Sequence, residues 1–278
     1  MGRNLARSSR NSSVIEFTCD SVGDFLDTIS PNGSVMSRFE TLKGRCIFRG
    51  VRSSRHLLVP TALRGDITGW EHFEFVNGVD DLQGQLLWEQ HLLRSFFQLS
   101  DAQGLHVPEN GQALRHTAQR LATYDYVYEV LGGQQAWPPD EMFSLLGIAQ
   151  HSGLPTRLLD WTRDPFVAAY FAASGASATT DQADEVLAVW VLYLASASDL
   201  RKRQTKDLII VSSPAALNPR LHAQQGLFTL YRPQKFDPSL PVHNVPLDDY
   251  IQPPPPKTKK TCSCSGWSHC RYPTLRNC

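Results

Sequence analysis

The segment from Gln150 to Ala172 constrains the fold more than any other part of this sequence. Within it, Thr156–Trp161 is a predicted strand that carries polar side chains at both ends. Asp164 and Pro165 then supply an N-cap and a first helical residue, which predicts a short helix of small residues over Phe166–Ala173. Each buried polar group without a partner costs about 1–3 kcal/mol, so a purely structural strand has no need of so many. The segment therefore predicts a functional site beside a helix that packs closely on a sheet.

Hydrophobic periodicity predicts helices mainly before this segment and strands mainly after it. The predicted helices are Ser21–Ile29, Leu86–Leu99, Gln112–Leu131 and Asp140–His151, and Gly153 with Pro155 ends the last of them. The predicted strands are Cys46–Phe48, Thr156–Trp161, Val186–Leu194, Leu208–Val211 and Leu227–Tyr231. Clustering of helices and strands in this way favours an α+β fold over an alternating α/β fold.

Composition divides the chain into three parts. Hydrophobic residues make up 41% of the 278 residues, so the chain can form a sizeable core. Residues 1–13 are expected to be a flexible arm and residues 14–251 a single domain. The prolines Pro253–Pro256 favour an extended chain, so residues 252–278 are expected to be a disordered, basic, Cys-containing tail.

Charge and motif content exclude several classes of protein. The two ends hold eight basic residues and no acid, which leaves 19 basic against 27 acidic residues and a charge of −8 between them. An acidic body is not typical of a tight duplex binder. The sequence has no phosphate-binding P-loop, no dinucleotide-binding glycine motif, no zincin motif and no hydrolase elbow. It has no apolar stretch of membrane-spanning length and no secretory signal, so a cytoplasmic location without membrane contact is expected.

The six cysteines do not predict a metal site. Cys19 and Cys46 are expected to be reduced thiols in the folded part. The remaining four have a spacing that matches no common zinc module: Cys262, Cys264, Cys270 and Cys278.

Five motifs in a fixed order identify a family resemblance. They are Phe48-Arg49-Gly50, Pro60-Thr61-Ala62-Leu63-Arg64, Gln150-His151-Ser152-Gly153-Leu154-Pro155-Thr156-Arg157-Leu158-Leu159-Asp160-Trp161-Thr162, Pro165-Phe166-Val167-Ala168-Ala169-Tyr170-Phe171-Ala172 and Gln225-Gly226-Leu227-Phe228. On these residues the chain resembles the FRG domain family, which is named for its Phe/Tyr-Arg-Gly motif. The motif order also resembles that of ADP-ribosyltransferases, in which a first strand with Arg, a second strand leading into a helix, and a third strand with Glu surround NAD.

The resemblance implies a fold and a set of roles. The helical N-terminal half would pack on a split, mostly antiparallel β-sheet of the ADP-ribosyltransferase type. The residues that would bind NAD, as substrate, are Phe48, Arg49, Gly50, Arg64, Thr156, Arg157 and Tyr170. Those that would take part in catalysis are Arg49, Asp160, Thr162 and Gln225. Arg49 would donate to a ribose or phosphate, Gly50 would let the backbone approach the nicotinamide, and Tyr170 would stack on its ring.

The third motif departs from the enzyme pattern, because Gln225 stands where a catalytic Glu is expected. An amide can orient a ribose hydroxyl but cannot act as a general base. Either Asp160 or Glu89 would then supply the carboxylate, or the acceptor is an easily activated nucleophile, or the domain binds a nucleotide without transfer. In the last case Arg64 and Arg157 would serve as phosphate ligands.

Structural alternatives accompany these roles. Arg49 would pair with Asp160 in a semi-buried ion pair, and His151 would cap a helix rather than act as a base. Trp161 and Phe171 are expected in the core, Tyr170 either in the core or stacked on a ring, and Glu89 toward solvent. Gln225 and Gly226 would form a bulge before a strand.

Three functions follow from these expectations. The first is an NAD-dependent ADP-ribosyltransferase acting on nucleic acid or protein, as the toxin of a toxin–antitoxin or phage-defence system, with an antitoxin or chaperone as partner. The second is a nucleotide- or RNA-binding regulator without turnover. The third is a metal-free ribonuclease that uses His151 and Arg157.

Overall fold

The computed structural model of the chain describes residues 15–38, 46–65, 81–177, 186–194, 207–212, 226–233, 236, 242, 247 and 274–277. The chain forms two compact units that alternate along the sequence. The first unit takes residues 1–57, 161–205 and 248–278, and the second takes 58–160 and 206–247. Residues 1–13 and most of 252–278, for which the sequence predicts a flexible arm and a disordered tail, lie outside the described residues.

The first unit is built on strands whose pairing is mostly antiparallel. Its strands are β1 (Ile15–Thr18), β2 (Cys46–Val51), β4 (Ala188–Tyr193), β7 (Thr274–Asn277) and the end of β3 (Leu158–Thr162). β2 pairs antiparallel with β4 and with β3, β1 pairs antiparallel with β7, and β4 pairs parallel with β7. The sequence predicts β2, β3 and β4 but neither β1 nor β7, which are short.

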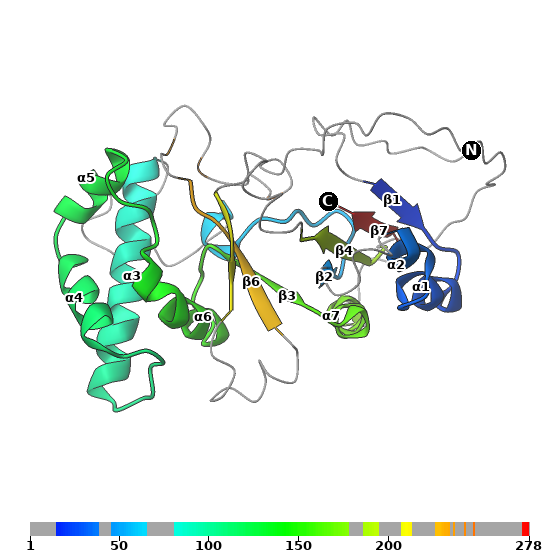
Figure 1. Ribbon diagram of the computed structural model, residues 1–278, viewed down its shortest axis with the longest axis horizontal. Coiled ribbons are helices and arrows are strands. Elements are labelled where there is room, and N and C mark those ends of the chain that lie inside the picture. The colour runs from blue at the N-terminus through cyan, green and yellow to red at the C-terminus, as the bar shows by residue number, and fades with distance from the viewer. Residues whose placement is uncertain are drawn as a thin grey trace. The chain divides into compact units, whose positions relative to one another are not determined.

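The described residues of the first unit form the helices α1 (Val22–Ile29), α2 (Ser34–Arg38) and α7 (Pro165–Ser177). The side chain of Ser21 begins α1 by accepting from the backbone N–H of Asp24 at 3.1 Å. Apolar residues of α1 and α2 form one buried cluster with β2, β4 and the small residues of α7. Figure 1 shows α7 beside β2, where the sequence predicts that a small-residue helix packs on a strand.

Most of the helices in the described residues belong to the second unit. They are α3 (Leu82–Ala102), α4 (Gln112–Arg120), α5 (Asp125–Leu131), the 3-10 turns η2 (Thr61–Leu63) and η4 (Asp140–Met142), and α6 (Phe143–His151). Asp81 begins α3 by accepting from the N–H of Gly84 at 2.6 Å. Gly153, in a left-handed conformation at φ 89°, follows the end of α6. The predicted helices that begin at Leu86 and Asp140 are therefore confirmed.

The prediction of one continuous helix over Gln112–Leu131 is wrong. The structure has two helices, α4 and α5, separated by a turn at Leu121–Tyr124. The amide of Gln90, on α3, donates to the carbonyl of Leu121 at 2.6 Å and to that of Thr123 at 3.0 Å. This buried side chain satisfies carbonyls that a continuing helix would use itself, a tertiary contact that helical periodicity does not reveal.

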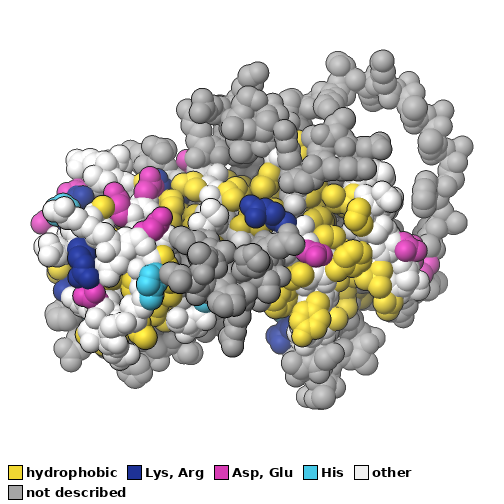
Figure 2. All heavy atoms as spheres, turned by 60° about the horizontal axis from the view of Figure 1, so that its bottom comes forward, with side chains coloured by type: hydrophobic (Ala, Val, Ile, Leu, Met, Phe, Trp, Pro, Cys, Tyr) yellow, Lys and Arg dark blue, Asp and Glu magenta, His cyan; other side chains and the backbone are white. Residues whose placement is uncertain are grey.

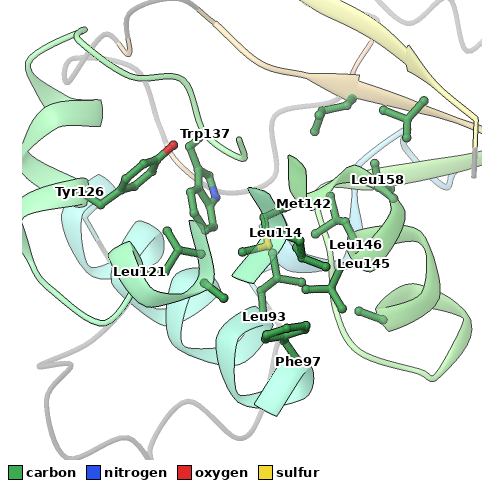
Figure 3. Packing of buried hydrophobic residues seen from close by; sticks show 14 of the residues in the cluster. Leu93, Phe97, Leu114, Leu121, Tyr126, Trp137, Met142, Leu145, Leu146 and Leu158 are labelled. Carbon is green, nitrogen blue, oxygen red and sulfur yellow. The ribbon is translucent and has the colours of Figure 1, made fainter. Parts of the chain in front are cut away.

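The second unit also holds the start of β3, β5 (Leu208–Val211) and β6 (Gly226–Tyr231). β5 and β6 pair antiparallel, with Leu208 opposite Tyr231. Leu158, Val211 and Phe228 from these strands join the helical side chains in a single buried cluster, part of which Figure 3 shows. The predicted α+β class, with helices packed on mostly antiparallel strands, is confirmed.

Candidate functional site

The Phe48-Arg49-Gly50 motif lies on β2 where this strand passes α7. A Cβ atom built on Gly50 would lie 1.9 Å from the carbonyl oxygen of Ala168 and 2.7 Å from the amide nitrogen of Ala172. Both contacts are with backbone atoms, so no rotation of a side chain would make room. Glycine is required here for the close packing of strand and helix, whatever the site binds.

Arg49 lies on the face of the sheet that points away from α7. Side chains alternate along a strand, so Phe48 and Gly50 share the α7 face while Arg49 takes the other. Thr162 is opposite Phe48 in the antiparallel pair and therefore shares the face of Phe48. The structure brings Arg49 and Thr162 to neighbouring strands but not to one face.

Thr162 has a structural role at the end of β3. It is buried, and its hydroxyl accepts a hydrogen bond from the backbone N–H of Asp164 at 3.0 Å. The carboxylate of Asp164 in turn accepts from the N–H groups of Phe166 at 2.8 Å and Val167 at 3.4 Å. Together they set the turn from β3 into α7, which confirms the N-cap predicted at Asp164.

The outer side of α7 exposes aromatic rings. Tyr170 is 68% exposed and Phe171 is 43% exposed, and their rings meet edge to face with centroids 5.9 Å apart. Phe166, one turn before Tyr170, is also exposed. Figure 2 shows hydrophobic side chains gathered over this helix. The prediction that Phe171 is a core residue is wrong, the core alternative for Tyr170 is excluded, and the prediction of a buried Trp161 is confirmed.

The second unit contains a buried polar cluster around Glu89. Trp137, which donates to Glu89, is also part of the hydrophobic cluster in Figure 3. The carboxylate of Glu89 accepts from Gln85 Nε2 at 2.5 Å, from Trp137 Nε1 at 2.7 Å and from Arg157 Nε at 2.5 Å. Glu89 is only 7% exposed, so the prediction that it faces solvent is wrong. The hydrogen bonds from these three donors compensate the desolvation of the Glu89 charge. Two of the donors, Trp137 and Arg157, lie outside α3, so the amphipathic pattern of this helix does not reveal them.

Arg157 is the cationic partner in this cluster. It is 5% exposed, its Nε donates to Glu89, and its guanidinium lies over the ring of Phe236 at 5.4 Å from the centroid. Within the part of the chain that the structure describes, its Nη2 is buried and has no hydrogen-bond partner. Because Glu89 already balances its charge, Arg157 is poorly suited to hold a phosphate or to act as the cation of a ribonuclease.

Polar side chains continue from Arg157 along the central motif. Thr156 is buried, donates to Gln150 Oε1 at 2.6 Å and accepts from the N–H of Leu158 at 3.2 Å. Gln150 Nε2 donates to Asp160 Oδ1 at 3.5 Å, and Asp160 is exposed. The structure therefore links Gln150, Thr156 and Asp160 by hydrogen bonds.

Two further predicted residues, Arg64 and His151, lie outside the segment from Thr156 to Asp160. Arg64 is exposed, and its Nε donates to the carbonyl of Val59 at 3.2 Å. His151 occupies the last turn of α6, as expected for a residue near a helix C-terminus, and its ring meets Phe228 edge to face at 5.9 Å. Gln225 lies outside the described residues, and Gly226 begins β6.

A small pocket opens beside the Glu89–Arg157 ion pair. It is lined by apolar side chains of α3 and α6, by the segment before β3, and by Glu89, Thr156 and Arg157. Its enclosed part has room for about one water molecule. Sequence reasoning missed Trp137 and Gln85 here, although the four-residue spacing of Gln85 and Glu89 places both on one side of a helix.

The thiol of Cys46, two residues before the Phe48-Arg49-Gly50 motif, is unreactive at neutral pH. Cys46 begins β2 and is buried in the first unit, and burial raises the pKa of its thiol to about 11. Cys46 is therefore protonated at neutral pH and is not a nucleophile.

The described residues contain no group of three or more His, Cys, Asp or Glu side chains that could hold a metal ion. None of the helices in the described segments is long and apolar enough to cross a membrane.

Comparison with known proteins supports one family. The model of the FRG domain matches residues 44–181, a range that runs from just before β2 to just after α7. Comparisons with curated proteins and with solved structures gave no match. The chain therefore carries an FRG domain, at residues 44–181.

Proposed function

We propose that this FRG domain binds NAD and acts as an ADP-ribosyltransferase, with nucleic acid or protein as the acceptor. The observation that carries the proposal is the pairing of the first two motifs. The strand with Phe48-Arg49-Gly50 lies against the end of β3, and β3 leads directly into a small-residue helix that packs on Gly50. This pairing supports the proposal, because the motif order that the chain resembles also has a first strand with Arg and a second strand that leads into a helix.

Arg49 is the residue that we assign to NAD. Its planar guanidinium, on the sheet face away from α7, suits bidentate contacts with a ribose or phosphate. In the reaction the bond between ribose C1′ and nicotinamide breaks, and the electron pair leaves with nicotinamide. The acceptor nucleophile then bonds to C1′ and loses its proton. Tyr170, on the exposed side of α7, suits contact with the acceptor better than stacking on a nicotinamide beside Gly50.

Asp160 is the carboxylate that we assign to the charged transition state. Of the two alternatives to a third-motif Glu, Glu89 is buried and engaged by three donors, whereas Asp160 is exposed. A carboxylate stabilises the positive charge that develops on the ribose as nicotinamide departs. Gln225 would orient a ribose hydroxyl. We further propose that the protein works in the cytoplasm as the toxin of a toxin–antitoxin or phage-defence system.

The test is incubation of the full chain with NAD labelled in its adenosine part, together with a cell lysate. We expect nicotinamide release and a labelled macromolecule, both lowered about a hundredfold or more in Arg49→Lys, because lysine cannot form the bidentate fork. The control is Arg115→Lys, an exposed arginine of the second unit that pairs with Asp101. Absence of both products with the wild-type chain would refute transfer.

The engagement of Glu89 favours a second candidate, a nucleotide-binding regulator without turnover. Neither Glu89 nor Gln225 can then serve as the third-motif carboxylate. This candidate predicts that NAD stays intact but protects the chain from thermal unfolding, and that Arg49→Lys removes the protection. Intact NAD without any protection would exclude both candidates.

A further inference from the structure

The buried guanidinium of Arg157 has an unused donor at the pocket of the second unit. Arg157 is 5% exposed and lines this pocket, and its Nη2 has no hydrogen-bond partner among the described residues. A buried donor left in this state costs about 1–3 kcal/mol, so native proteins usually satisfy such a group with water or ligand. The pocket therefore offers a place for an acceptor oxygen.

Glu89, the ion-pair partner of Arg157, also lines this pocket and offers the complementary group. A carboxylate has about four lone-pair positions, and three of them are taken by Gln85, Trp137 and Arg157. One acceptor position of Glu89 is thus available to an N–H donor. A group that carries an acceptor and a donor side by side would satisfy both residues.

The remaining walls select against a charged ligand. Apolar side chains, including Leu92, Leu146 and Leu154, make up most of the lining. The charge of Arg157 is already balanced by Glu89. An anion in the pocket would therefore be repelled by the Glu89 carboxylate and would find no unbalanced positive charge to bind. The enclosed part accommodates a group about the size of one water molecule, while the rest of a ligand would lie toward the open side.

We infer that this pocket binds an uncharged carboxamide on an aromatic or apolar body. Its carbonyl oxygen accepts from Arg157 Nη2, its N–H donates to Glu89, and its apolar body lies against the leucines of the pocket. The inference does not depend on ADP-ribosyl transfer, and it is tested without NAD.

The experiment measures binding of four small probes to the full chain by NMR. The reporter is the indole N–H signal of Trp137, which donates to Glu89 and is assigned with Trp137→Phe. The probes are benzamide, N,N-dimethylbenzamide without the donor, benzoate with a negative charge, and toluene without polar atoms. We expect saturable shifts with benzamide and roughly tenfold weaker binding of N,N-dimethylbenzamide and benzoate, the loss that one hydrogen bond to a charged group produces. Toluene loses both hydrogen bonds and should bind more weakly still.

Variants separate this pocket from other places where benzamide can bind. Leu154→Phe fills the pocket and keeps the ion pair, so we expect it to weaken benzamide binding about tenfold or more. The matched control is Leu87→Phe, on a leucine that packs on the same core but does not line the pocket, and it should bind like the wild type. Arg157→Lys keeps the charge beside Glu89 but lacks Nη2, so it should bind benzamide about tenfold more weakly than the wild type.

The outcomes are distinct. Binding of benzamide that Leu154→Phe weakens and Leu87→Phe does not weaken supports the inference. No saturable shift with benzamide means that the space holds only an ordered water, which overturns it. Equal binding of all four probes, or equal loss in both leucine variants, also overturns it. The thermal midpoint of each variant, measured beforehand, shows whether it is folded.

Discussion

The two units pack their secondary-structure elements in different ways. In the first unit the contact between β2 and α7 depends on the absence of a side chain, since Gly50 lets two backbones touch. In the second unit helices pack through large apolar side chains around a buried ion pair, Glu89 with Arg157. The packing therefore depends on the absence of a side chain in the first unit and on a buried ion pair in the second. Different substitutions should destabilise the two units.

The largest effect is expected from Gly50→Ala. Its Cβ would meet the backbone of α7 at 1.9 Å, so we expect destabilisation beyond the roughly 1–3 kcal/mol typical of an overpacked site. Hydrogen exchange should show lost protection in β2, β4 and α7. The control is Gly23→Ala on exposed α1, where a Cβ has no contact closer than 3.9 Å and should be neutral or slightly stabilising. Normal protection in Gly50→Ala would contradict the steric account.

The next effect is expected from Glu89→Leu, which leaves the Arg157 cation buried and unpaired. Breaking one side of a buried ion pair costs about 3–5 kcal/mol, measured as the free energy of unfolding in urea. The double variant Glu89→Leu with Arg157→Met should recover most of the loss, since an apolar pair of similar volume removes both charges. If the double variant is no more stable than the single one, the hydrogen bonds of Glu89 and Arg157 stabilise the fold beyond balancing each other's charge.

Alkaline unfolding should distinguish the units through Cys46 and Tyr126. Burial raises the pKa of the Cys46 thiol from 9.0 to about 11 and that of the Tyr126 hydroxyl from 10.0 to about 12. Because both folded pKa values exceed the unfolded ones, each neutral group stabilises the fold at lower pH. The contribution of Cys46 is lost between about pH 9 and 11, and that of Tyr126 between about pH 10 and 12.

Each loss is at most on the order of 3 kcal/mol, as expected for about two pKa units. Cys46→Ala should flatten the fall of the unfolding free energy between pH 9 and 11, and Tyr126→Phe the fall at higher pH. The measurement is urea unfolding across this pH range, followed by far-UV circular dichroism. An unchanged pH dependence in Cys46→Ala would show that other groups govern the alkaline response.

The smallest effect is expected at the helix caps, where the units behave alike. Asp81 caps α3 in the second unit and Asp164 caps α7 in the first. Replacing either by Ala should cost about 1 kcal/mol, because the backbone N–H groups at the start of the helix lose their acceptor. Asp→Asn at each position should retain most of the stability. A much larger loss for Asp164→Ala would show that the turn set by Thr162 depends on the cap.

Local signals in the sequence predict much of this fold. The short apolar run Cys46–Phe48 and the cap at Asp164 are signals from neighbouring residues, and the structure has β2 and α7 where they indicate. The break between α4 and α5 is different, because it depends on Gln90, which comes from α3. β1 and β7 are also beyond local prediction, since they pair across the length of the chain.

The candidate site is less predictable for the same reason. The polar density of the central motif correctly indicates the chain of contacts through Thr156 and Gln150. It does not indicate that Glu89 is the partner of Arg157, because 68 residues separate the two in sequence. Nor does the sequence show that Thr162 and Arg49 take opposite faces, since this depends on the register of β2 against β3.

The contact at Gly50 has a genetic consequence. An overpacked side chain is usually rescued by trimming its neighbour, but the atoms that a Cβ at position 50 would strike belong to the main chain of Ala168 and Ala172. Shortening Ala168 or Ala172 to Gly leaves those atoms in place. Selection for second-site suppressors of Gly50→Ala should therefore yield reversion at position 50 and no compensating change at position 168 or 172.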